Sequence, residues 1–166
     1  MAGVEPLLGL EHNRRTRIRF SVNAAPAARF EGGTAAVPAR LQAMRRAALA
    51  GFPVGLTIAP IMALPGWREA YDQLLREAGS ALEGVPGLDL SVELITHRFT
   101  PGSKRVLNEW YKGSSLDMNE ATRTKKPTKF GSLKYVYPAE LMRELRTFFE
   151  SSVQVHLPGA RILYWT

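Results

Sequence analysis

The sequence predicts an α/β fold whose parallel strands are connected by helices, and three observations predict it. Apolar strand-like segments alternate with amphipathic helical segments, and helical crossovers of this kind join parallel strands. Residues 53–61 are almost continuously apolar, as expected for a strand buried on both faces. The pattern changes near residue 127, where a hairpin, a helix and a terminal strand follow. The length of 166 residues corresponds to about one domain.

The first strand is predicted at residues 16–23, where polar and apolar residues alternate with the period of two of a β-strand. Residues 24–34, which contain Pro26 and a Gly-Gly pair, are predicted to form a loop. Residues 38–50 form a helix with one apolar side, and Gly51 follows as its C-terminal cap. The apolar segment 53–61 is then the second strand.

A second helix is predicted at residues 65–82, where apolar residues recur near helical spacing. Residues 84–87 form a turn, and residues 88–99 form the third strand. A short helix at 103–111 and a basic loop up to Pro127 follow.

The last segment has a different pattern. Two extended pieces within 128–137 flank Gly131-Ser132, which predicts a β-hairpin. A helix from 138 to about 151 and a strand at 161–165 complete the chain.

The first strand has a strongly polar face, formed by Arg17, Arg19, Ser21 and Asn23. This face suits either the inner wall of a polar cavity, as in a barrel, or an edge strand whose polar face lies in water. The barrel alternative predicts functional residues at the carboxyl ends of the strands. These ends are residues 21–23, 59–60 and 97–99.

The net charge of +7 is concentrated in one part of the chain. Residues 98–134 hold nine basic and three acidic residues. The basic ones are Arg98, Lys104, Arg105, Lys112, Arg123, Lys125, Lys126, Lys129 and Lys134. Aromatic residues interleave with them, and this combination favours a nucleic-acid partner over a merely solvated surface.

The chain contains no cysteine, which excludes disulfides, thiolate zinc sites, ordinary iron–sulfur ligation and a cysteine nucleophile. Its three histidines are far apart, so we expect no metal site held by this chain alone. No apolar run is long enough for a membrane helix, and the N-terminus lacks the features of a signal peptide. We therefore expect a cytoplasmic protein without a membrane partner.

Several motifs together resemble the spore photoproduct lyase family, in the family's order and spacing. They are RTRIRFSVN (15–23), GFPVGLTIAPI (51–61), Gly66-Trp67, ELITHRFTPGSKRV (93–106), KFGSLKYVYP (129–138) and the terminal ARILYWT. The resemblance covers about residues 12–166 and corresponds to the C-terminal half of a typical family member.

The resemblance implies a radical S-adenosylmethionine enzyme with a partial (β/α)6, TIM-like barrel, of which this chain is the C-terminal half. In such enzymes a 4Fe-4S cluster on a CxxxCxxC loop cleaves S-adenosylmethionine to a 5′-deoxyadenosyl radical. That radical abstracts hydrogen from 5-thyminyl-5,6-dihydrothymine in double-stranded DNA, which splits into two thymines, and a further cysteine donates hydrogen. Because this chain has no cysteine, we expect no catalytic residue in it and a missing or separately encoded N-terminal half.

The resemblance also implies roles for individual residues. Ser21 matches a serine that contacts the amino-acid moiety of S-adenosylmethionine, and Ala59 matches a position whose backbone carbonyl accepts a hydrogen bond from the adenine. Lys129 and Phe130 match an Arg-Tyr pair on a hairpin that probes the lesion. Here the lysine lacks the planar fork of arginine, and the phenylalanine lacks the hydroxyl of tyrosine.

Other residues complete the predicted site. Three further lysines are expected to hold DNA phosphates near the lesion: Lys125, Lys126 and Lys134. Six residues are expected at the pocket wall without an assigned role: Arg19, Asn23, Glu93, His97, Arg98 and Tyr135. For the glutamate and Arg98, a structural ion pair is the alternative to a role in catalysis.

The sequence thus predicts a lead-in at 1–13, the half-barrel at 14–126 and a DNA-contacting hairpin with a helix and strand at 127–166. Three functional hypotheses remain open. The chain is half of a spore photoproduct lyase, inactive alone; or a non-catalytic basic DNA-binding remnant; or an unstable product of a decayed gene.

Overall fold

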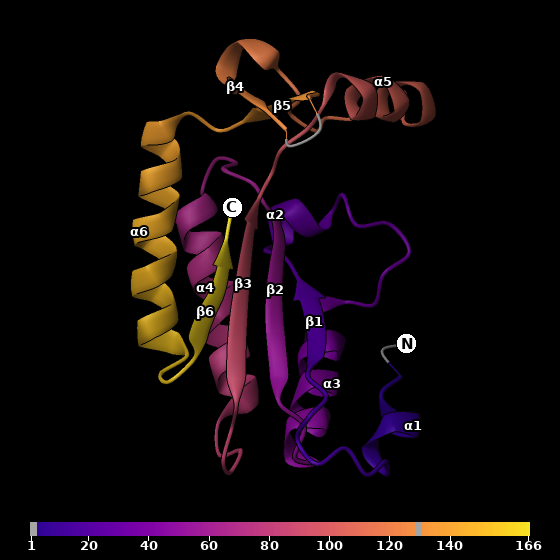
Figure 1. Cartoon of the computed structure of the whole chain (residues 1–166), viewed down its shortest axis with the longest axis vertical. Coiled ribbons are helices and arrows are strands. Elements are labelled where there is room, and N and C mark those ends of the chain that lie inside the picture. Colours follow the sequence, from indigo (N-terminus) through magenta and orange to yellow (C-terminus); the bar gives the residue numbers. More distant parts are fainter. Residues whose placement is uncertain (1–2, 129–130) are drawn as a thin grey trace.

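Four parallel strands form the main sheet, in the order β1-β2-β3-β6, in a computed structural model that describes residues 3–128 and 131–166 (Figure 1). The strands are β1 (Ile18–Val22), β2 (Val54–Ile61), β3 (Leu90–Thr96) and β6 (Arg161–Trp165). Every neighbouring pair is parallel, which confirms the predicted parallel α/β arrangement. In this sheet β1 and β6 are the edge strands.

Three long helices cover one face of the sheet: α3 (Val37–Leu49), α4 (Trp67–Leu82) and α6 (Ala139–His156) (Figure 1). Alternate apolar side chains of the strands face these helices, so that Val22, Leu56 and Val92 are fully buried. Burial of one large apolar side chain contributes roughly 1.5–3 kcal/mol. Figure 1 shows no helix of the described residues over the opposite face.

Helix α3 ends as its sequence predicts. Gly51 has a φ of +85°, a conformation that costs glycine little. Its N–H bonds the carbonyl of Ala48, and the N–H of Phe52 bonds the carbonyl of Ala47. This pair of bonds is a Schellman motif, which satisfies the last carbonyls of the helix and turns the chain into β2.

Two short helical turns lie where the sequence predicted irregular structure. Helix α1 (Glu5–Leu8) lies within the predicted lead-in, and α2 (Ala25–Ala28) lies within the predicted loop after β1. In both, a proline occupies one of the first two helical positions, where its missing N–H is not needed. The lead-in is also attached to the core, because His12 stacks on Phe52 with 3.6 Å between ring centroids.

The remaining elements lie beyond the carboxyl ends of the strands (Figure 1). Helix α5 (Pro101–Trp110) begins with a capping box between Thr100 and Ser103. A short 3₁₀ helix, η1 (Glu120–Thr122), precedes a hairpin of β4 (Thr124–Pro127) and β5 (Leu133–Val136).

Two predicted boundaries were wrong. The first arm of the hairpin lies within the predicted basic loop, because its residues are all exposed and show no alternation. Helix α6 continues to His156 rather than ending near Ser151, because Ser152 and Val153 extend the buried side begun by Leu145 and Phe149. No helix of the described residues has both the length and the apolarity needed to cross a bilayer.

Candidate functional site at the carboxyl ends of the parallel strands

Polar and charged side chains lie on the uncovered face of the sheet. Arg19 Nε donates to Glu93 Oε1 over 2.6 Å, and Thr57 Oγ1 donates to Glu93 Oε2 over 3.3 Å. Gly55 lies beneath the arginine, and an added Cβ there would lie 2.9 Å from Arg19 Cγ. The absence of a side chain at Gly55 therefore lets Arg19 reach across the sheet from β1 to β3.

The alternative ion pair between Glu93 and Arg98 is not formed. Glu93 pairs with Arg19, whereas Arg98 Nη1 donates to Thr166 Oγ1 over 2.9 Å. The reason is geometric, because Glu93 projects from within β3 and Arg98 lies beyond the end of that strand.

A second ionic cluster lies nearer the amino ends of the strands. Asp89 Oδ1 accepts bonds from Arg17 Nη2 over 2.9 Å and from Arg161 Nη2 over 2.7 Å. The hydrogen bond from Arg17 is the main cause that lowers the pKa of the Asp89 carboxyl. The uncovered face is thus lined by charges that are paired within the chain.

Ser21 and Ala59, the residues matched to S-adenosylmethionine contacts, line one hollow of about 550 Å³ together with Glu31 and Arg40. Arg40 Nη1 donates to the carbonyl of Ser21 over 2.8 Å, and its Nη2 donates to Glu31 Oε2 over 2.9 Å. Glu31 Oε1 and Arg40 Nε are buried and lack a hydrogen-bond partner among the described residues. Such a wall offers both a donor and an acceptor to a polar ligand.

A larger hollow of about 930 Å³ adjoins the first and is lined by His97, Arg98 and Leu107. The two hollows share four lining residues: Phe30, Glu31, Gly32 and Tyr111. They therefore form one continuous depression across the carboxyl ends of the strands, where the sequence predicted the site.

A buried arginine lies beside this depression. Arg123 donates to the carbonyl of His97 over 3.1 Å and to Asp117 Oδ2 over 3.1 Å. Burial, together with this neighbouring guanidinium, lowers the pKa of His97 from 6.5 to about 4. His97 is therefore neutral at physiological pH and cannot serve there as a cationic group.

Two residues expected at the pocket wall are instead buried in the fold. Asn23 is 1 % exposed, and its side chain bonds Pro60, Tyr71 and the N–H of Ala24. Tyr135 is 5 % exposed, and its ring stacks on Phe99 with 5.1 Å between centroids. Both residues connect segments of the fold.

The hairpin presents lysines to solvent. Lys125 and Lys126 are exposed, and Lys134, which is half-buried, is the cross-strand partner of Lys126. Lys129 and Phe130, the residues matched to the lesion-probing pair, lie outside the described residues.

Three functional candidates were missed by the sequence analysis: Glu31, Arg40 and Arg123. Glu31 lies in a segment predicted as a loop, and Arg40 lies on a helix where a solvated arginine is the ordinary expectation. Arg123 was counted among the exposed basic residues, yet its side chain is 1 % exposed. These roles depend on side-chain contacts that periodicity does not reveal, such as Arg40 with Glu31 and Arg123 with His97.

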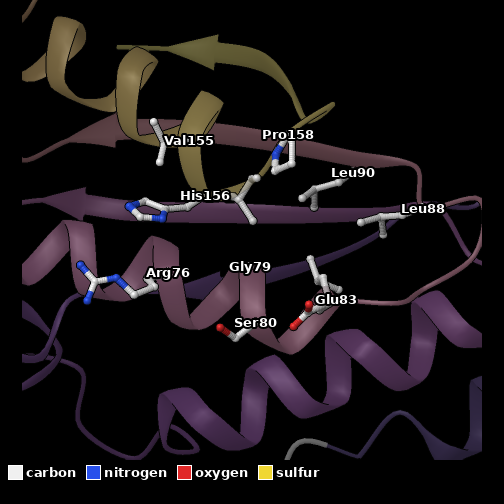
Figure 2. Close-up of a pocket in the computed structure, with 11 residues that line it drawn as sticks. Arg76, Gly79, Ser80, Glu83, Leu88, Leu90, Val155, His156 and Pro158 are labelled. Atoms are coloured by element: carbon white, nitrogen blue, oxygen red, sulfur yellow. The ribbon is translucent and has the colours of Figure 1, made fainter.

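Another pocket lies at the opposite, amino end of the sheet (Figure 2). It lies between the end of α4, the start of β3 and the end of α6, and its lining includes Gly79, Leu88 and Val155. His156 Nε2, at its rim, pairs with Asp72 Oδ1 over 2.7 Å. This pocket is remote from the strand ends that carry the predicted site.

Comparison with known proteins assigns the family. A family model described as spore photoproduct lyase matches residues 1–166. The spore photoproduct lyase of Geobacillus sp. (strain Y412MC61) is 42 % identical over 164 residues, which cover 98 % of this chain and 48 % of that protein. The enzyme of Bacillus subtilis (strain 168) is 38 % identical, with the same coverage.

Solved structures of spore photoproduct lyases support the same family assignment. A spore photoproduct lyase complexed with the dinucleoside spore photoproduct superposes with a TM-score of 0.95 at 38 % identity, over 99 % of this chain and 49 % of that one. A mutant lyase with bound AdoMet and the same dinucleoside superposes with a TM-score of 0.93, also at 38 % identity and the same coverage. The chain spans about half the length of these relatives. It belongs to the spore photoproduct lyase family, and it corresponds to the half that its motifs identify as C-terminal.

Proposed function

We propose that this chain is the C-terminal half of a spore photoproduct lyase and acts in DNA repair only when joined by a half that carries the cluster. In that assembly it forms one side of a partial (β/α)6 barrel. The substrate is 5-thyminyl-5,6-dihydrothymine in double-stranded DNA, and the products are two thymines.

The observation that carries this proposal is the uncovered, polar face of a parallel sheet. Parallel sheets are normally covered on both faces, because each crossover helix packs against one of them. Here the helices cover one face, and the other carries Arg19, Glu93 and Thr57. The edge of β1 offers backbone groups to a further strand. Both features are expected if a second half of a barrel completes the site.

The residues present fit S-adenosylmethionine but not the cluster. Ser21 is exposed and shares a hollow with Ala59, and the unpartnered atoms of Glu31 and Arg40 offer polar contacts there. When bound, S-adenosylmethionine supplies a carbon radical for hydrogen abstraction. A 4Fe-4S cluster needs thiolates, and this chain contains none. The chain's own part is therefore to bind and orient.

The hairpin supports binding of the lesion strand. A base dimer must leave the duplex before its atoms can be reached, and something must brace the gap. The hairpin lies beyond the carboxyl ends of the strands (Figure 1), at the end of the sheet where the depression also lies. We propose that Lys125, Lys126 and Lys134 hold phosphates and that Lys129 and Phe130 contact the lesion.

Complementation tests the proposal. The chain is mixed with a separately expressed, cluster-loaded N-terminal half of a relative, and conversion of the lesion into two adjacent thymines within an oligonucleotide is measured. We expect repair with both halves and none with either alone. In the same assay Ser21→Ala should raise the KM for S-adenosylmethionine, whereas Ser151→Ala, on an exposed position of α6, should not. Failure of two folded, co-purifying halves to repair the lesion would refute the proposal.

A non-catalytic DNA-binding remnant is the second candidate, and the exposed lysines of the hairpin favour it equally. It predicts affinity for DNA with a steep dependence on salt, because cations on the protein release counterions from phosphates. Competition between lesion-containing and undamaged duplexes separates the two functions. A preference for the lesion supports the half-enzyme, and equal competition supports the remnant.

A further inference from the structure

We propose that Arg123 is a positioning residue that fixes the β4–β5 hairpin against the carboxyl end of β3. The inference rests on the proposed function in one respect, namely that this hairpin contacts the lesion strand. Arg123 itself touches neither the depression's ligand nor DNA in this role, and it acts through the hairpin.

Arg123 joins three segments that are separate in sequence. Its Nη1 donates to the carbonyl of His97, just past β3, and its Nη2 lies 3.1 Å from Asp117 Oδ2, in the loop before η1. Its guanidinium lies over the ring of Tyr137, just past β5, with 3.8 Å between Cζ and the ring centroid. Both ends of the hairpin are thus held by one side chain, since Arg123 immediately precedes β4.

The chemistry of the contact requires arginine. The planar guanidinium donates along its edge to a carbonyl and a carboxylate while its face stacks on an aromatic ring. Lysine would keep the charge but lose the second donor direction and the stacking face. The Arg123 side chain is 1 % exposed, so its bond to the His97 carbonyl is shielded from water, whereas the Asp117 side chain is 51 % exposed. Arg123 Nε has no partner among the described residues, so the hydrogen bonds of Nη1 and Nη2 must offset the cost of burying the guanidinium.

Few other contacts attach the hairpin to the sheet. The backbones of Phe99 and Tyr135 exchange two hydrogen bonds, of 2.7 and 3.2 Å, and their rings stack. At the surface, Lys104 on α5 pairs with Glu120 over 3.0 Å. An exposed pair of this kind contributes little. Removal of Arg123 therefore leaves two attachments at the base of the hairpin, the Phe99–Tyr135 bridge and the hydrogen bond that Ala63 N–H donates to the Tyr137 hydroxyl over 3.1 Å.

The consequence for the proposed reaction is a defect in lesion binding rather than in S-adenosylmethionine binding. The hairpin carries Lys125 and Lys126 at a fixed angle to the strand ends only while its base is held. Ser21 and Ala59 line a hollow whose lining does not include Arg123. The KM for lesion DNA should rise while the KM for S-adenosylmethionine stays constant.

Amide hydrogen exchange on the isolated chain tests the structural part. The probes are the amides of Phe99 and Tyr135, which report docking of the hairpin, and that of Ile18, which bonds Pro53 at the far end of the sheet. In Arg123→Met we expect the first two to exchange about tenfold faster or more, with Ile18 unchanged. Arg123→Lys should show an intermediate effect.

Lys104→Met is the matched control, because it removes an exposed cation that contacts the same region, and it should leave all three amides unchanged. Equal acceleration of Ile18 in Arg123→Met, or failure of both Arg123 variants to fold, would show a general role in stability and overturn the inference. Unchanged exchange at Phe99 and Tyr135 would overturn it too.

The functional part uses the complemented enzyme. Arg123→Met should raise the KM for lesion DNA about tenfold, with kcat for bound DNA and the KM for S-adenosylmethionine near those of the wild type. Loss of kcat with unchanged KM for DNA would overturn the inference. If complementation itself fails for the wild type, the proposed function falls, while the exchange result still decides whether Arg123 positions the hairpin.

Discussion

Mild acid should destabilise this protein through His97. The pKa of His97 is lowered to about 4 in the fold, chiefly by burial, whereas in the unfolded chain it returns to 6.5. As the pH falls below 6.5, His97 is therefore protonated in the unfolded chain but stays neutral in the folded chain. The contribution of neutral His97 to stability is fully present above pH 6.5 and is lost as the pH falls from 6.5 toward 4. Below pH 4 this residue causes no further change in the free energy of unfolding.

The size of the effect follows from the two pKa values. Between pH 7.5 and pH 5.0, the free energy of unfolding should fall by roughly 2 kcal/mol from this residue alone. The Asp72, Asp89 and Asp117 carboxyls, whose pKa values are all lowered in the fold, contribute in the same direction but mainly below about pH 4. The Glu120 carboxyl, whose pKa is also lowered, chiefly by hydrogen bonds, contributes mainly below about pH 5, so His97 dominates the change in the chosen range.

Urea unfolding at a series of pH values provides the assay, with His97→Gln as the control. The wild type should lose about 2 kcal/mol more than the variant between pH 7.5 and 5.0. The comparison uses the change with pH, so any constant cost of the substitution cancels. Parallel pH profiles for the two proteins would refute the reasoning, because they would show that His97 protonates equally in both states.

Two glycines and one tyrosine give further predictions about stability. Gly79→Ala should destabilise by about 3 kcal/mol, because the added Cβ would collide with the backbone carbonyl of His156 where α4 meets the end of α6 (Figure 2). Gly102→Ala, in α5, places its Cβ in ordinary contact, 3.8 Å from Thr100 Oγ1, and should be neutral or stabilising by about 0.5 kcal/mol. Thermal unfolding compares the two, and an equal effect would contradict the packing seen here. Tyr71→Phe should cost about 1–3 kcal/mol in urea unfolding, because the buried N–H of Met62 loses its acceptor; no loss would indicate another partner.

Periodicity in the sequence was sufficient for the sheet and its helices. The alternation in 16–23 and the apolar run of 53–61 predicted β1 and β2, because these patterns lie in the strands' own residues. The burial on both faces expected for 53–61 was wrong, since Thr57 lies on the uncovered face. Gly51 marked the end of α3 for a similarly local reason, since its positive φ favours glycine. Features determined by neighbours in sequence were therefore predictable.

Features determined by distant partners were not. The net charge of residues 98–134 follows from the sequence, but it does not indicate which of the basic side chains are exposed. Arg123 is buried, Arg98 bonds Thr166, and Lys104 bonds Glu120, so these three cations are occupied within the chain. Asn23 likewise continues the polar alternation of β1, yet its side chain is buried and accepts a hydrogen bond from the Tyr71 hydroxyl. Net charge and alternation identify a surface, and only tertiary contacts decide which of its residues are free.

The uncovered sheet face bears directly on whether this chain folds without a partner. Its main apolar cluster lies on the helix-covered side, where Val22, Leu56, Val92 and Phe149 are 0 % exposed. The opposite face exposes mainly paired charges, and pairing there needs no second chain. If a second half completes a barrel, as proposed, its absence removes a wall of the site but little of the core. We expect the purified chain to unfold cooperatively in urea, with coincident circular dichroism and fluorescence transitions. A gradual, non-coincident transition would instead favour the unstable product of a decayed gene.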